Sequence, residues 1–158
     1  MPLSSEFLHL ARERLAVPRP GLTESHLRRA TSDLYYAMFH CVCESLARPV
    51  ARQGQSEAER AAYLNLYRSP DHKALESACR SKLVEHFPEP VRNFARWLVS
   101  MKNKREEADY NPLKRFVFSE VRSDLDGVSA AIAEFGELDE RHRFAFAAFA
   151  GLRMRTTP

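Results

Sequence analysis

The residues best suited to chemistry lie in the segment KNKREEADYNP, residues 102–112. Arg105 and Asp109 are four residues apart, so on a helix the guanidinium and the carboxylate share a face and can pair. Tyr110 follows and adds a phenol hydroxyl. An arginine can stabilise charge on a phosphate, whereas a carboxylate with an ordinary pKa of ~3.9 is a poor proton acceptor at neutral pH. These three residues are candidates for catalysis, although Asp109 is better suited to anchoring Arg105 than to acting as a base.

Arg105 also continues an apolar stripe of the predicted helix. Steps of four, three and four residues back from Arg105 reach Met101, Leu98 and Phe94. A face of this kind packs against a core, where a guanidinium needs acceptors for its five donors. We therefore expect this guanidinium to be held inside the protein by Asp109, Tyr36 and His40. Replacing Arg105 with alanine should then cost roughly 3–5 kcal/mol, because a buried carboxylate loses its partner.

The segment 23–47 is predicted to form a long helix with two different faces. One face carries a core-facing row, which consists of Leu27, Ala30, Leu34, Ala37 or Met38, and Cys41, and which ends at Cys41 or at Ser45. The other carries a polar row, which consists of Arg29, Asp33, Tyr36, His40 and Glu44. A solvated surface with ion pairs along the helix is the commoner explanation of such a row, and the alternative is a polar groove that faces Arg105.

Further candidates lie close to Arg105 and at the start of another helix. Basic side chains that could form a mouth for phosphates are Lys102, Lys104, Lys114, Arg115, Arg28 and Arg29. Asp71 and His72 follow a proline, where aspartate commonly caps a helix. The candidate residues for binding a ligand or RNA are thus Tyr36, His40, Asp71, His72, Lys102, Lys104 and Arg105.

The composition indicates one helical domain, which we take to span residues 1–158. Glycine is scarce, with 5 residues, while alanine, leucine, arginine and glutamate are common. The net charge of +3 is too small to predict nucleic-acid binding by itself. No apolar run suits a membrane span or a signal peptide, so we expect a cytoplasmic protein. The three cysteines form no metal-binding pattern, and we expect no metal and no cofactor.

Caps and helix breakers predict an all-α, up-and-down bundle of six to seven helices. The expected helices are 4–16 with Ser4 or Ser5 as cap, 23–47, 57–67, 71–84, 90–109, 119–135, and a last one that Asp139 caps. Gly136 is expected to end the sixth. The last segment, ERHRFAFAAFAGLRMR, carries more apolar side chains than one short helix can hide, which favours a dimer.

Three motifs in order give the sequence a resemblance to a known family. LRRATSDLYYAMFHCVCESL, YRSPDHKALESAC and KREEADYNP together resemble the HEPN superfamily, in the branch with a Tyr-Tyr-Ala helix motif and an Arg-x-x-Ala-Asp-Tyr ending. The likeness is strongest over residues 23–112. It implies a helical bundle that forms a homodimer, and a role in RNA binding, in RNA cleavage, or in pairing with a nucleotidyltransferase-like protein in toxin-antitoxin or defence systems.

The sequence departs from that family where the cleaving members have a histidine. Those members carry Arg and His four to six residues apart at this helix end, but only Glu, Ala, Asp, Tyr and Asn lie between Arg105 and Pro112. We therefore expect a non-catalytic protein that binds RNA, a nucleotide or a partner. The alternative is a diverged, metal-independent ribonuclease that uses the site around Arg105.

Overall fold

The computed structural model describes residues 1–50 and 56–153, which fold into α-helices and two 3-10 helices without a strand. This confirms the prediction of an all-α helical bundle. The α-helices are α1 (Leu3–Leu15), α2 (Glu24–Ala47), α3 (Glu57–Tyr67), α4 (His72–Cys79), α5 (Glu89–Tyr110), α6 (Phe118–Glu137) and α7 (Glu140–Gly151). The 3-10 helices are η1 (Arg48–Val50) and η2 (Lys82–His86).

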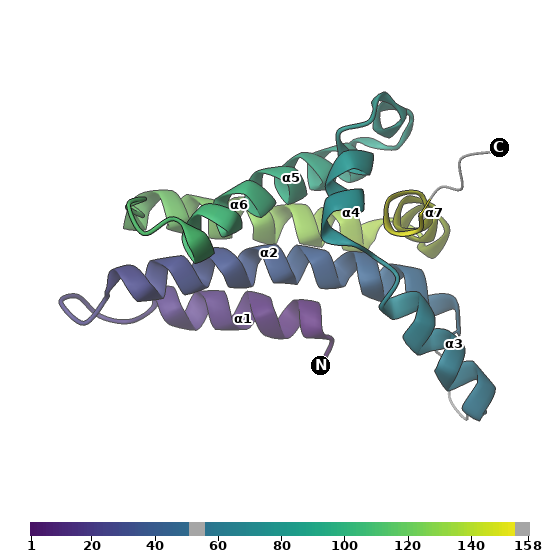
Figure 1. Cartoon of the computed structure of the whole chain (residues 1–158), viewed down its shortest axis with the longest axis horizontal. Coiled ribbons are helices and arrows are strands. Elements are labelled where there is room, and N and C mark those ends of the chain that lie inside the picture. The colour runs from purple at the N-terminus through teal and green to yellow at the C-terminus, as the bar shows by residue number, and fades with distance from the viewer. Residues whose placement is uncertain (51–55, 154–158) are drawn as a thin grey trace.

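The long helix α2 is the centre of the bundle (Figure 1). α1 runs antiparallel along one side of it, and α5 and α6 lie along the other side. The shorter helices α4 and α7 pack near the end where α2 finishes. α3 points away from the bundle, and none of its residues is buried.

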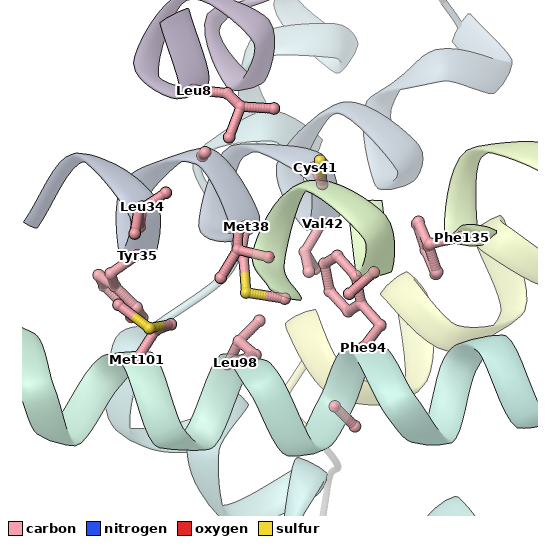
Figure 2. Packing of buried hydrophobic residues seen from close by; sticks show 14 of the residues in the cluster. Leu8, Leu34, Tyr35, Met38, Cys41, Val42, Phe94, Leu98, Met101 and Phe135 are labelled. Atoms are coloured by element: carbon pink, nitrogen blue, oxygen red, sulfur yellow. The ribbon is translucent and has the colours of Figure 1, made fainter. Parts of the chain in front are cut away.

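The core forms where the core-facing row of α2 meets α5 (Figure 2). Every residue assigned to that row is buried, and so are Phe94, Leu98 and Met101 of α5. Both stripes read from the sequence are therefore confirmed. The sequence pattern succeeds here because helical spacing determines which side chains share a face.

Two helix ends differ from the prediction. α4 ends at Cys79 and not at Val84, because the chain turns there and continues as η2. The hydroxyl of Ser81 accepts a hydrogen bond from the amide of Leu83, 3.2 Å away, and so begins the 3-10 helix. α6 begins at Phe118 and passes through Gly136 to Glu137, so this glycine does not break the helix.

The start of α1 corrects a further expectation. The cap residue is Pro2, and neither Ser4 nor Ser5 caps the helix. Ser4 instead lies inside α1 and donates from its hydroxyl to Oε2 of Glu44 on α2, 2.6 Å away. The serine therefore joins two helices, which its position near a helix start could not reveal.

α7 buries part of its apolar side chains. Phe146, Ala147 and Ala150 are buried, and Phe146 contacts the rings of Phe94 and Phe135 edge-on. Phe144 and Leu152 stay exposed, and the dimer stays a prediction. No described helix combines the length and the apolar character that crossing a bilayer requires.

Candidate functional site

A cleft of about 830 Å³ opens between α1, the part of α2 from Glu24 to His40 and the last turn of α5. Its walls include Phe7, Arg29, Tyr36, His40, Asp109 and Tyr110. Of the polar row of α2, Arg29, Asp33, Tyr36 and His40 line this cleft, whereas Glu44 lies outside it. Arg105 is not on the wall of this cleft, but two of its neighbours, Tyr36 and Asp109, are.

Arg28 fixes the end of α5 against the start of α2. Its Nη1 donates to the carbonyl oxygens of Ala108, 2.9 Å away, and Asn111, 3.0 Å away. Its Nη2 donates to the carbonyl of Lys114, and its Nε lies 3.2 Å from Oε1 of Glu24. A cation here satisfies carbonyls that the end of a helix leaves unpaired. Arg28 therefore shapes the cleft and is not free to bind phosphate.

Arg105 lies behind the cleft wall, with only 14% of its side chain exposed. Its Nη2 donates to the hydroxyl of Tyr36, 2.9 Å away, and its guanidinium lies over the rings of Tyr35 and Tyr36. Nε is 3.1 Å from Oδ2 of Asp109 but is not aimed at it, so the two form an ion pair without a hydrogen bond. The predicted partners Tyr36 and Asp109 are present.

His40 was expected to hold Arg105, and the structure corrects this. Its Nδ1 is 2.7 Å from the hydroxyl of Tyr67 on α3, and its ring stacks on Phe7 of α1 with 5.2 Å between centroids. Burial lowers the pKa of His40. His40 therefore serves the contact of α2 with α1 and α3.

The three carboxylates of the cleft already have partners. Glu24 pairs with Arg28 and accepts a hydrogen bond from the amide of Phe116, 3.1 Å away. Asp109 accepts a hydrogen bond from the hydroxyl of Ser32, 2.6 Å away, besides its ion pair with Arg105. Asp33 pairs with Arg14 of α1 at 2.5 Å, while burial raises its pKa. Within residues 1–50 and 56–153, no three side chains of His, Cys, Asp or Glu gather as they would around a metal ion.

Asp71 and His72 do not line the cleft. Asp71 caps α4 by accepting from the amides of Lys73 and Ala74, as the sequence predicted. His72 turns its Nδ1 to the hydroxyl of the buried Tyr35, 2.6 Å away. Burial, and then the nearby charge of Arg105, lower the pKa of His72.

Lys102 and Lys104 are also directed away from the cleft, contrary to the expected basic mouth. Lys102 is 2.8 Å from Glu76 of α4 and 2.5 Å from Glu106, and only 9% of its side chain is exposed. Lys104 lies 2.7 Å from Asp124 of α6. The sequence could not reveal Glu76 and Asp124 as partners, because they depend on how α4 and α6 pack against α5, whereas Glu106 is four residues from Lys102 on the same helix.

The cleft offers a ligand an exposed cation and an exposed aromatic ring. Arg29 is exposed and makes no hydrogen bond or ion pair with the described part of the chain, although its charge opposes the rise that burial causes in the pKa of Asp33. Tyr110 is 74% exposed at the rim. Phe7 and Ser32 also line the cleft, and the sequence alone did not reveal either. Nothing in the pattern places Phe7 of α1 against this part of α2, and the role of Ser32 depends on its contact with Asp109 of α5.

Comparison of the chain with protein-family models, with curated proteins and with solved structures finds no match. The likeness to HEPN proteins therefore rests on its three motifs. Of the residues in those motifs, the fold joins Tyr36 of the second helix to Arg105 of the fifth, and Ser32 of the second to Asp109 of the fifth.

Proposed function

We propose that this chain is an up-and-down, HEPN-like bundle that binds single-stranded RNA in the cleft between α1, α2 and α5 without cleaving it. One observation carries the proposal: an unpaired guanidinium, that of Arg29, and an exposed aromatic ring, that of Tyr110, line the same cleft. Proteins that bind single strands commonly combine a cation for the phosphate with a ring on which a base stacks.

The size of the cleft and the exposure of Tyr110 support this assignment. A volume of about 830 Å³ is within the range of sites that hold a ligand of nucleotide size. The ring of Tyr110 is exposed, with the guanidinium of Arg105 5.9 Å from its centroid, and stacking of one base on an aromatic ring contributes about 1–3 kcal/mol. Single-stranded RNA exposes unstacked bases for this kind of contact, whereas a duplex hides them.

Binding without cleavage follows from how the other polar groups of the cleft are used. All three carboxylates of the cleft have partners, and the guanidinium of Arg105 lies behind Tyr36 and not in the opening. His40 is held by Tyr67 and by the ring of Phe7. Cleavage at the 2′-hydroxyl needs a free base close to a free cation. Arg29 is a free cation, but the carboxylates and the imidazole that could act as the base are already committed.

Fluorescence anisotropy with a labelled, mixed-sequence RNA in the presence of EDTA tests the proposal. Tyr110→Ala should weaken binding by about 1–3 kcal/mol, which is roughly 5- to 150-fold in Kd. Arg29→Gln should lower the dependence of log Kd on log salt by about 0.7, the value for one lost phosphate contact on a single strand. Arg122→Gln is the matched control, because Arg122 lies on α6 near Asp126 and outside the cleft.

The same samples separate binding from cleavage. Intact RNA after incubation supports a binding protein, whereas EDTA-resistant products that disappear in Arg105→Ala would establish the ribonuclease alternative. Parent-like affinity in both Arg29→Gln and Tyr110→Ala would reject this cleft as the RNA site.

The homodimer and a nucleotidyltransferase-like partner in a toxin-antitoxin or defence system are supported by the resemblance alone. Light scattering that gives a monomer at high concentration would count against the dimer.

A further inference from the structure

A second, smaller pocket of about 170 Å³ lies near the other end of α2. It is bounded by the start of α1, the last turns of α2, the end of α6 and the first turn of α7. Its lining includes Ser4, Glu44, Ser45, Arg48, Gly136 and Arg143. Nothing in the proposed RNA site uses these residues.

The pocket gathers donors that have no acceptor. Nε of Arg143 is buried and unpaired, and the rest of its guanidinium makes no hydrogen bond or ion pair with the described part of the chain. The side chain of Arg48 is likewise free of such bonds to residues 1–50 and 56–153. Ser45 is 9% exposed, and its hydroxyl has no partner within those residues either. A buried donor without an acceptor is rare in folded proteins, so this arrangement needs an explanation.

The acid of the pocket does not supply the missing acceptor. Both carboxylate oxygens of Glu44 accept from Ser4, one from its amide at 3.0 Å and one from its hydroxyl at 2.6 Å. Two guanidiniums and one carboxylate leave this pocket with a net positive charge.

We propose that this pocket binds a phosphoryl group, either free phosphate or the phosphate of a nucleotide. A phosphate presents oxygens in several directions, which suits Arg48, Arg143 and the hydroxyl of Ser45 as separate donors around one centre. A guanidinium also matches the spacing of two phosphate oxygens. The pocket would not accept a base as well, because its volume is about a fifth of that of the RNA cleft.

The phosphate pocket is separate from the RNA cleft. Arg29 and Ser45 lie on the same helix, and at 1.5 Å of rise per residue they are about 24 Å apart along its axis. The two proposals can therefore fail independently. When a residue of one site is replaced, unchanged ligand binding at the other site shows that the variant is still folded.

NMR of the arginine Nε–H signals during titration with inorganic phosphate, at constant ionic strength in chloride, tests the pocket directly. The Arg143 signal, assigned by its loss in Arg143→Gln, should shift and saturate. Arg143→Gln should weaken the binding of phosphate at least about tenfold, measured by the phosphorus signal of the ligand, and Ser45→Ala should weaken it severalfold. Arg141→Gln is the matched control, since Arg141 is an exposed neighbour on α7 outside this pocket.

The second arm of the titration uses adenosine monophosphate. If Arg143 responds to it more strongly than to phosphate, the phosphoryl group comes from a nucleotide, and the reverse order indicates free phosphate. Arg29→Gln should leave both titrations unchanged. If the Arg143 signal responds to neither ligand at tens of millimolar, or if Arg143→Gln and Ser45→Ala bind phosphate as tightly as the parent, water satisfies these donors and the proposal is wrong.

Discussion

Arg105 shows what a single residue reveals in a sequence and what it conceals. Its helical spacing from Phe94, Leu98 and Met101 predicted that the guanidinium would lie inward, and its side chain is 14% exposed. The i, i+4 spacing predicted Asp109 as partner. His40 could not be judged in the same way, because its partner Tyr67 comes from α3 and a helical period says nothing about contacts between helices.

The structure changes the expected cost of removing Arg105. The side chain of Asp109 is 25% exposed, and its Oδ1 keeps the hydrogen bond from Ser32, so Arg105→Ala does not leave a buried, unpaired carboxylate. We now expect a loss of about 1–3 kcal/mol, which covers the hydrogen bond to Tyr36 and the packing on the aromatic rings. Urea unfolding followed by circular dichroism measures it.

Two further variants separate charge from packing at this position. Arg105→Ala combined with Asp109→Asn should recover part of the loss, because the second substitution removes the carboxylate charge that the first one leaves without its arginine. Arg96→Ala removes an exposed arginine from the same helix and should leave the unfolding midpoint where it is. A midpoint for Arg105→Ala equal to that of the parent would show that the guanidinium adds nothing to the fold.

At the scale of the helices, local chemistry predicted starts better than ends and contacts. Asp71 and Asp139 cap α4 and α7 as expected, since an aspartate side chain satisfies the free amides of a helix start. The predicted end of α4 and the predicted role of Ser4 were wrong, because both features depend on neighbouring elements. The candidate cleft could be predicted in part for the same reason. The sequence indicated the polar residues of α2 that line it, but it did not indicate that α1 forms another wall.

The packing of α5 on α6 makes a sharp prediction about Gly127. A Cβ atom at this position would lie 2.1 Å from the ring of Trp97, so that ring would have to move. Gly127→Ala should destabilise the protein by about 1–3 kcal/mol, as overpacking of a well-filled interior does, and should shift the tryptophan fluorescence. Trp97 is the single tryptophan of the chain, so the signal reports on this contact alone.

Gly136 is the matched control on the same helix. A Cβ atom there would meet nothing within 4 Å, and α6 continues through this residue. Gly136→Ala should therefore stabilise the protein by about 0.4–1 kcal/mol, because alanine has less freedom to lose on folding. Equal effects of the two substitutions would show that Trp97 does not pack closely on Gly127.

At the scale of the whole molecule, the arrangement around α2 makes stability depend on pH. His40 joins α2 to α1 and α3, and His72 joins it to α4, so both imidazoles are held between helices. Burial lowers the pKa of both histidines. The negative charge of Glu44 partly offsets this effect at His40, and that of Asp71 partly offsets it at His72. The folded protein therefore binds protons at these residues less readily than the unfolded chain does.

The sign of the effect follows from this difference. The unfolded histidines take up protons as the pH falls through ~6.5, while the folded ones stay neutral until their lower pKa values are reached. The contribution of these two histidines to the free energy of unfolding should therefore be at its full value above pH ~6.5. It should decrease as the pH falls from that value to the pKa values of the folded protein. Asp33, whose pKa is raised, acts in the opposite direction, but only in the lower range where carboxylates titrate.

Urea unfolding at a series of pH values between 5 and 8 measures this dependence. The combined variant His40→Gln with His72→Gln should lose most of the slope below pH ~6.5, because glutamine does not titrate there. His9→Gln is the control, since His9 is exposed on α1 with 59% of its side chain accessible, and it should keep the slope of the parent. If the double variant instead follows the parent across the whole range, groups other than these two histidines set the pH dependence of the bundle. The burial of His40 and His72 between helices would then not make stability depend on pH.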